Sequence, residues 1–175
     1  MREAALRRRS YSAVTDEAPS HEELADIVRA ASRVADHGSL RPWRILEIRG
    51  DSRTLVGRAL AKAAGDDGIS SKPLRAPLLL AVVASRRPSA KAPAWEQDTT
   101  ASGVAHLLTL LLDEAGWGVF WRTGEYTRSK PVRKAHGLAG HEELLGWLYV
   151  GGIREKDRLD RPRRPADPDD VLSLL

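Results

Sequence analysis

The chain has 175 residues, of which 42% are hydrophobic and 30% charged, so one domain with a single core is expected and whole-chain disorder is excluded. It contains no cysteine, which excludes disulfides, thiolate nucleophiles and metal sites built on sulfur. The net charge is +4, and no apolar run approaches the ~20 residues that cross a bilayer, so we expect a cytoplasmic protein without a membrane partner.

Hydrophobic periodicity predicts alternating helices and strands without internal repeats. Ser20 followed by Glu23 forms a capping box, Asp51 or Ser52 suits a second helix cap, and the continuous apolar run from Leu78 to Ala84 predicts a buried central strand. In chain order we expect helices at 2–9 and 22–35, a strand at 45–48, a helix at 51–64, a strand at 78–84, a helix at 95–115, a strand at 119–121, a helix at 129–137, a helical turn at 142–145 and a strand at 147–150.

The helix expected at 95–115 is apolar on more than one face. Leucine and valine side chains from Val104 to Leu112 form one stripe, and Ala101, Ala105 and Leu110 widen it. Such a helix must be enclosed on more than one side, and a partner subunit is a natural source of that cover. Residues 1–152 are therefore expected to form the single domain, and residues 153–175, which lack core periodicity, an extended C-terminal arm. The elements alone also allow a parallel α/β sheet, although no glycine-rich phosphate turn is present.

Basic residues gather at Arg7–Arg9 and along the C-terminal arm. In the arm, acidic residues separate the basic ones, and no recognisable nucleic-acid-binding pattern occurs, so we expect a small phosphorylated ligand rather than nucleic acid. Arg161, Arg163 and Arg164 could add phosphate contacts. No metal site is expected, because His136 and His141 lack a third ligand at metal-site spacing.

The segment from Asp36 to Trp43 places an acid, a titratable ring and a hydroxyl on one exposed corner after a helix. Gly38 can take the positive φ of a helix exit, and Pro42 prevents the helix from resuming. Such a corner suits a planar polar ligand. The alternative, given equal weight on this segment alone, is a capping loop with an incidental histidine.

Four landmarks then occur in order: Arg7-Arg8-Arg9-Ser10, Asp36–Trp43, Trp95-Glu96-Gln97 and Phe120–Gly124. Together they resemble the nitroreductase-like FMN oxidoreductases, in particular the small single-domain bacterial members, over residues 6–151. The resemblance implies an α+β fold with a mainly antiparallel central sheet wrapped by helices, paired as an intertwined homodimer.

The resemblance also implies which residues bind the cofactor. Arg8, Arg9 and Ser10 match the FMN-binding start, and the family's loop against the isoalloxazine matches Trp121, Arg122, Thr123 and Gly124. Arg33 and His37, four residues apart and so expected on one side of a final helical turn, would reach the flavin of the other subunit. Without the resemblance, Arg8–Ser10 would be a solvated helix end and Trp121 a core residue.

The implied activity is transfer of hydride from NADH or NADPH through FMN to a nitroaromatic, a quinone or a similar acceptor. No catalytic side chain is expected, because the flavin carries the redox chemistry. The alternative is a non-enzymatic homodimer that binds flavin or another phosphorylated ligand for storage or sensing. Ser12, Gly38 and Arg41 differ from residues common in the family, which bears on substrate preference.

Overall fold

The computed structural model describes residues 2–158 and 165–174 and shows an α+β fold, as predicted. Its four-stranded sheet is antiparallel throughout and has the order β1-β2-β4-β3. The strands are β1 (Trp43–Ile48), β2 (Leu78–Ser85), β3 (Trp117–Arg122) and β4 (Glu142–Gly152). The α-helices are α1 (Arg2–Arg7), α2 (His21–Ala31), α3 (Asp51–Ala63), α4 (Ala94–Glu114), α5 (Lys130–Ala135) and α6 (Pro168–Val171). Short 3-10 helices are η1 (His37–Ser39), η2 (Lys72–Arg75), η3 (Glu125–Arg128) and η4 (Glu155–Asp157).

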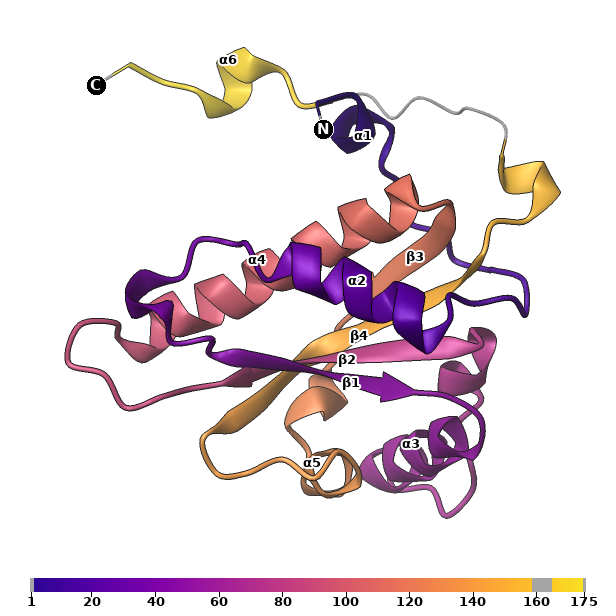
Figure 1. Ribbon diagram of the computed structural model, residues 1–175. Coiled ribbons are helices and arrows are strands. Elements are labelled where there is room, and N and C mark those ends of the chain that lie inside the picture. Colours follow the sequence, from indigo (N-terminus) through magenta and orange to yellow (C-terminus); the bar gives the residue numbers. More distant parts are fainter. Residues whose placement is uncertain (1, 159–164, 175) are drawn as a thin grey trace.

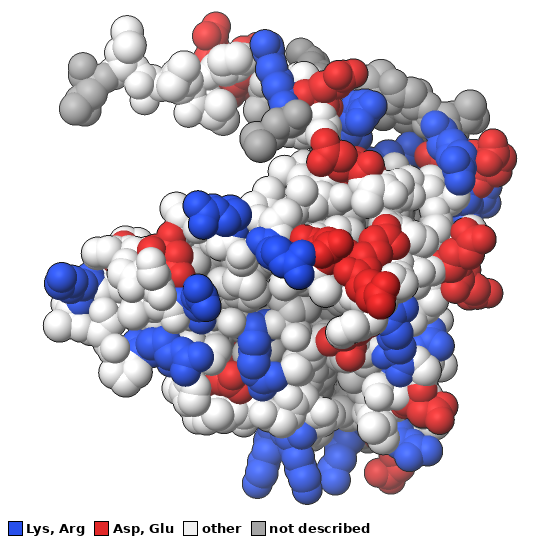
Figure 2. Space-filling view, viewed as in Figure 1, with Lys and Arg blue, Asp and Glu red and all other residues white. Residues whose placement is uncertain are grey.

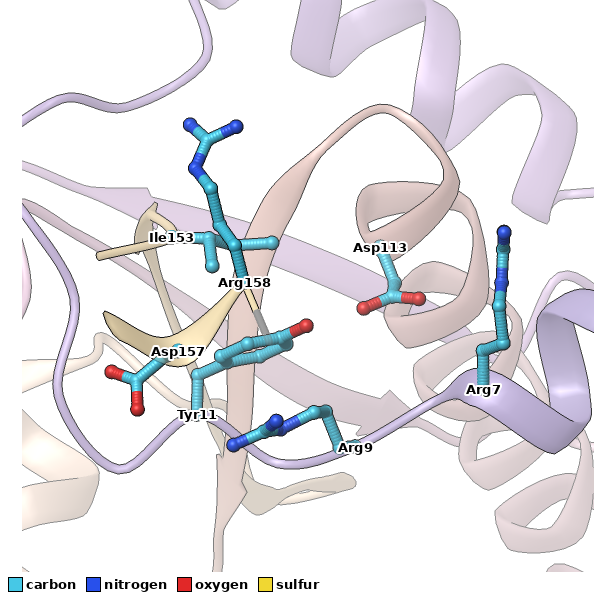
Figure 3. A pocket seen from close by; sticks show the side chains of 7 residues that line it. All are labelled: Arg7, Arg9, Tyr11, Asp113, Ile153, Asp157 and Arg158. Carbon is cyan, nitrogen blue, oxygen red and sulfur yellow. The ribbon is translucent and has the colours of Figure 1, made fainter. Parts of the chain in front are cut away.

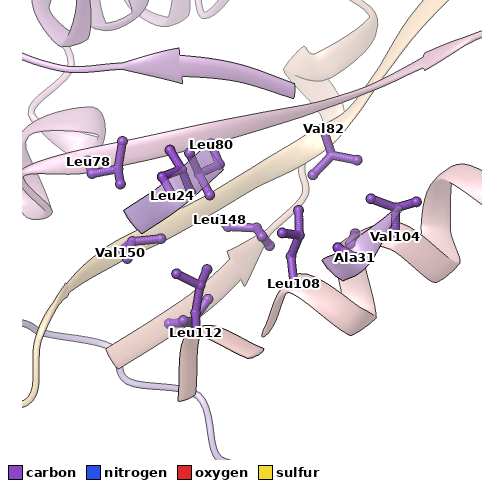
Figure 4. Packing of buried hydrophobic residues seen from close by; sticks show 12 residues of the cluster. Leu24, Ala31, Leu78, Leu80, Val82, Val104, Leu108, Leu112, Leu148 and Val150 are labelled. Carbon is purple, nitrogen blue, oxygen red and sulfur yellow. The ribbon is translucent and has the colours of Figure 1, made fainter. Parts of the chain in front are cut away.

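Helices cover both faces of the sheet, with α2 and α4 on one face and α3 and α5 on the other (Figure 1). The β2 side chains are buried along the whole strand and alternate between the two faces. Leu80 and Val82 pack with Leu108 of α4 (Figure 4), whereas Leu79 and Val83 belong to the core under α3. The continuous apolar run that predicted a central strand is therefore explained by burial on both faces.

The helix α4 is enclosed by α2 on one side and by strands of the sheet on another. Val104, Leu108 and Leu112 are fully buried, while Leu107 and Leu111 at its margin are only partly buried. The cover of this margin by a second subunit remains a prediction.

Three local expectations are wrong. The second helix ends at Ala31 rather than near residue 35, because the Ser32 hydroxyl donates to the Arg29 carbonyl (2.7 Å) and the chain turns. Residues 142–145 are not a helical turn but the start of β4, where Glu142, Glu143 and Leu144 pair with β2. Helix α3 is capped by Gly50, at φ 51°, and neither Asp51 nor Ser52 serves as its cap residue.

Within the described residues, no helix is long and apolar enough to span a membrane. The arm beyond β4 contains only η4 and α6 among its described parts, and the division into a domain at 1–152 and an arm at 153–175 stays our proposal. Arg161, Arg163 and Arg164 lie outside the described residues.

Candidate functional site

The segment that follows Arg8–Ser10 crosses the end of the sheet. The Tyr11 amide donates to the Val119 carbonyl of β3 (3.0 Å), and the Thr15 amide donates to the Gly152 carbonyl of β4 (2.8 Å). A Cβ on Gly151 would lie 2.6 Å from Val14 Cγ2, so only glycine admits the crossing segment here. The bond between Tyr11 and Val119 holds Ser10 beside β3. Because Val119 is two residues before Trp121 on the same strand, these two residues are about 7 Å apart.

A cavity of about 310 Å³ lies beside this crossing, between the N-terminal segment, the end of α4 and the arm. Figure 3 shows the Tyr11 hydroxyl and the Asp113 carboxylate pointing toward one another within it. The Arg9 guanidinium lies 5.1 Å from the centre of the Tyr11 ring. Burial raises the pKa of Asp113 although Arg7, Arg8 and Arg9 all act to lower it. Three cations thus gather around one half-buried carboxylate, which is a basic environment open to a ligand anion.

The segment Trp121–Gly124 borders a second cavity, of about 340 Å³, on the face of the sheet that carries α3 and α5. Four aromatic residues on this face line it, Phe120, Tyr126, Trp147 and Tyr149, together with polar residues that include Lys72 and Arg122. The Arg122 guanidinium stacks on two of these rings, 4.1 Å from the centre of Phe120 and 5.3 Å from that of Tyr149. The cavity therefore combines flat apolar walls with a held cation.

Two polar atoms of this segment are buried without a hydrogen-bond partner among the described residues: Trp121 Nε1 and Arg122 Nε. Gly146, at φ 137°, makes their position possible, because a Cβ there would lie 2.5 Å from the Arg122 carbonyl oxygen. Trp121 also packs edge-on against His106 of α4, with ring centres 5.0 Å apart. The core reading of Trp121 is therefore correct: its ring lies on the α4 face of the sheet, opposite the second cavity.

Behind the second cavity, His136 is buried and holds Trp147. The indole Nε1–H donates to His136 Nε2 (2.9 Å), and His136 Nδ1 lies 2.8 Å from the Val132 carbonyl oxygen. Because a carbonyl only accepts and an indole N–H only donates, both bonds require the neutral ring with its proton on Nδ1. Burial lowers the pKa of His136, in agreement with a neutral ring.

The corner at His37 is a strained turn pinned by one carboxylate. Asp36 Oδ2 accepts from the Arg41 amide (2.8 Å) and Oδ1 from the Leu40 amide (3.2 Å). Gly38 has φ 73°, as predicted, and Ser39 and Arg41 also have positive φ, at 53° and 47°. Such conformations are costly for residues other than glycine and are concentrated at functional loops.

His37 is held by a residue 59 positions away in the chain. Its Nδ1 lies 2.8 Å from Glu96 Oε1, while its side chain stays 51% exposed. Arg33 lies in the turn after α2, so the expectation that it shares a helical turn with His37 is wrong: the helix ends before both residues. Arg33 is exposed, and its side chain has no hydrogen bond or ion pair to any residue that the structure describes.

The segment that begins at Trp95-Glu96-Gln97 holds neighbouring loops in place through side-chain hydrogen bonds. The buried Gln97 side chain accepts from the Arg87 amide and donates to the carbonyls of Arg87 and Ala92. Asp98 binds Arg86 through two bonds of 2.8 and 2.7 Å. The sequence does not predict the contact between Glu96 and His37, because the two residues are 59 positions apart and no local pattern links them.

The expected cofactor-binding residues form two separate groups within one chain. Arg8–Ser10 and Trp121–Gly124 lie along β3, and the first of these also approaches Asp113 at the C-terminal end of α4. His37 contacts Glu96 at the N-terminal end of the same helix. Glu96 and Asp113 are 17 residues apart, which at about 1.5 Å per residue is about 26 Å. Within one chain His37 therefore lies far from Arg8–Ser10, whereas Trp121, which packs against His106, is ten residues or about 15 Å from Glu96 along the helix.

Comparison with known proteins identifies the family. The chain matches the Nitroreductase family over residues 5–73 and 58–152. It is 36% identical over 157 residues to YdjA of Escherichia coli K12, provisionally named an NAD(P)H nitroreductase, covering 85% of this chain and 86% of that protein.

Solved structures share the fold at lower identity. A nitroreductase-like family protein from Bacillus cereus superposes with a TM-score of 0.85 at 19% identity, covering 99% of this chain and 95% of that one. The FMN- and NADPH-dependent nitroreductase NfnB from Sphigopyxis sp. strain HMH gives a TM-score of 0.76 at 22% identity, covering 99% and 98% of the two chains. On the extent of the family match and the identity to YdjA, the chain belongs to the nitroreductase family.

Proposed function

We propose that this oxidoreductase of the nitroreductase family binds FMN and passes hydride from NADH or NADPH through it to a nitroaromatic, a quinone or a similar acceptor. The observation that carries the proposal is the second cavity, where the end of β3 places the Arg122 guanidinium over the rings of Phe120 and Tyr149. The related NfnB and YdjA carry names that state FMN or NAD(P)H dependence, which supports the same assignment.

The residues present fit what FMN requires of a protein. Its phosphate needs cations and hydroxyls, and Arg8 and Arg9 are half-buried while Ser10 is exposed beside them. Its ring needs a flat apolar surface with a hydrogen-bond donor beside it, and the second cavity offers the rings of Phe120 and Tyr149 with the Arg122 guanidinium next to them. A Cβ on Gly124 would meet nothing within 4 Å, so the backbone at the end of β3 is open to close approach.

When bound, FMN supplies a ring that accepts hydride and passes it on. The chain's own residues would bind the cofactor, orient it and shield it from water. Arg8 and Arg9 neutralise the phosphate, and the Arg122 guanidinium, fixed by stacking on Phe120 and Tyr149, places positive charge where the ring becomes negative on reduction. The aromatic walls exclude water from one side of the cavity. No side chain of the described site is required as a general acid or base.

The second part of the proposal is a homodimer with shared sites. Arg33 and His37 would contact the flavin held by Arg8–Ser10 and Trp121–Gly124 of the other subunit. The separation of His37 from Arg8–Ser10 along α4, the partly buried margin of that helix and the exposed Arg33 side chain support this arrangement. Glu96 would then act as a positioning residue, because it holds the His37 ring through Nδ1 while the side chain stays exposed.

The experiment that tests the function is anaerobic reduction of the purified protein. We expect a yellow protein whose visible flavin band bleaches on addition of NADH or NADPH and returns when a quinone or nitroaromatic is added; comparison of the two nucleotides identifies the donor. A bound flavin that neither nucleotide reduces would favour the alternative, a non-enzymatic flavin-binding dimer. A colourless protein that binds no added FMN would refute both.

A further inference from the structure

A groove between α3 and α5 plays no part in the proposed flavin site. It has a volume of about 630 Å³, which is within the range of small-molecule sites in proteins. Its apolar lining comes from Leu55, which is 55% exposed, and from Ala59, Pro131 and Ala135. All four side chains are saturated, so the groove offers contact to a hydrocarbon chain and no ring on which an aromatic ligand could stack.

The other residues that line the groove are cations, and no carboxylate is among them. They are Arg58 and Lys62 of α3 and Lys130 and Lys134 of α5. All four are exposed, and their side chains form no hydrogen bond or ion pair with another residue in the described part of the chain. Figure 2 shows Lys and Arg side chains projecting from the lower end of the molecule, where Figure 1 places α3 and α5. Positive charge therefore reaches the groove from both helices.

The spacing of these cations is unfavourable for the helices themselves. Arg58 and Lys62 are four residues apart in α3, and Lys130 and Lys134 are four residues apart in α5, so each pair lies on one side of its helix. Like charges at this spacing repel one another and destabilise a helix. Because α3 and α5 also contact each other, the two pairs add to one another's repulsion. An anion bound between the helices would offset it.

The lining contains no side-chain hydrogen-bond acceptor. Lysine and arginine only donate, and the other lining side chains are apolar. A ligand whose polar groups must donate, such as a sugar or an amine, would find no side-chain partner in the groove. A carboxylate only accepts, and a saturated chain attached to it matches the apolar lining. Both halves of the groove therefore fit an anionic head joined to a hydrocarbon chain.

We propose that the groove between α3 and α5 binds a single-chain anionic amphiphile of the fatty-acid type. The head lies between the cations of the two helices, and the chain covers Leu55, Ala59 and Pro131. A concave site of this volume favours one free molecule over the flat surface of a bilayer. The inference does not depend on the flavin, since none of these residues belongs to the proposed cofactor site.

Binding of radiolabelled dodecanoate to the full chain as purified, measured by equilibrium dialysis, tests the proposal. Dodecyltrimethylammonium has the same chain with a positive head, and it should bind at least about tenfold more weakly. Butyrate has the same head with a short chain, and it should also bind at least about tenfold more weakly, because fewer methylene groups are buried. Equal binding of dodecanoate and dodecyltrimethylammonium would overturn the proposal.

Two variants test where the amphiphile binds. Lys130→Glu with Lys134→Glu should weaken dodecanoate binding by about tenfold or more. The matched control, Arg87→Glu with Lys91→Glu, makes the same change of charge at two exposed loop residues and should leave binding unchanged. Leu55→Ser, at an exposed position, should weaken binding by about fivefold through lost apolar contact.

Flavin content should stay the same in all of these variants. Dodecanoate binding that neither groove variant weakens would overturn the proposal. Co-sedimentation with phosphatidylglycerol vesicles, in a chain that does not bind dodecanoate, would also overturn it by assigning the four cations to a membrane surface.

Discussion

The two ends of helix α4 hold different kinds of side-chain arrangement. At the C-terminal end, Arg7, Arg8 and Arg9 face the half-buried Asp113 beside an open cavity. At the N-terminal end, Glu96 and Gln97 are each committed to a specific hydrogen bond, with His37 and with the 87–92 loop respectively. One end gathers three cations beside a cavity, whereas the other uses its polar groups to hold neighbouring loops.

This difference separates residues that bind from residues that give the site its shape. A cation beside an open cavity can gain new bonds when a phosphate arrives, so its removal acts on affinity. A carboxylate that orients another side chain acts only through that side chain, so its removal has a smaller effect. The following substitutions test this distinction, from the largest expected effect to the smallest.

Arg9→Ala should have the largest effect. Loss of a charge-assisted contact to phosphate costs about 1.5–3 kcal/mol, which corresponds to FMN binding weaker by roughly 10- to 150-fold. Titration of the apoprotein with FMN, followed by flavin fluorescence, measures this change. The matched control is Arg2→Ala, an exposed arginine of α1, which should bind FMN normally. Unchanged affinity in both Arg8→Ala and Arg9→Ala would remove the arginine start from the site.

Glu96→Ala should weaken FMN binding less, by roughly threefold to tenfold, because one hydrogen bond that orients His37 contributes about 1 kcal/mol. Glu96→Gln keeps an acceptor for the His37 N–H and should restore most of the affinity. The control is Glu114→Ala at the other end of α4, where an exposed carboxylate contacts no predicted site residue. Equal losses in the alanine and glutamine variants would contradict a positioning role for Glu96.

The smallest effect concerns the wall of the second cavity and depends on pH. Burial lowers the pKa of His136 below its ordinary value of 6.5, so the folded state favours the neutral ring. That contribution to stability is complete above pH 6.5 and is lost as the pH falls through the lowered native pKa, because the unfolded chain binds the proton more readily. Urea unfolding at a series of pH values should show a shallower decline in His136→Gln than in the unchanged protein.

The exposed His141 supplies the control for this measurement. His141→Gln should leave the decline in stability between neutral and mildly acid pH unchanged. If His136→Gln loses stability with falling pH as steeply as the unchanged protein, the neutral His136–Trp147 bond is not the cause.

The sequence predicted the elements whose periodicity comes from the core. Leu78–Ala84 and the long apolar helix were correct because burial dictates both patterns. The end of α2 was missed because Val34 and Ala35 continue a helical pattern that the Ser32 hydroxyl interrupts. Residues 142–145 were misread because a paired Glu-Glu and Leu-Leu sequence does not alternate, although each residue alternates in burial within β4.

The candidate site, too, could be predicted only where a local sequence pattern marks its residues. The arginine start and the Trp121–Gly124 segment were found by resemblance, and the structure adds the glycines that place them. The bond between His37 and Glu96 joins residues 59 positions apart, and no local pattern indicates such a pair. Arg33 stays a predicted cofactor contact, but the expectation that it shares a helical turn with His37 was wrong.

Complementation between two defective chains tests most directly whether the flavin site is shared by two subunits. One chain carries Arg9→Ala, and the other carries Arg33→Ala with His37→Ala; each homodimer alone has two damaged sites. If the residues act in trans, the mixed dimer has one intact site and one doubly damaged site, and it should hold up to about half the FMN of the unchanged protein. If they act in cis, every site in the mixed dimer carries a defect. FMN content no higher than in the parental variants would then contradict the shared site.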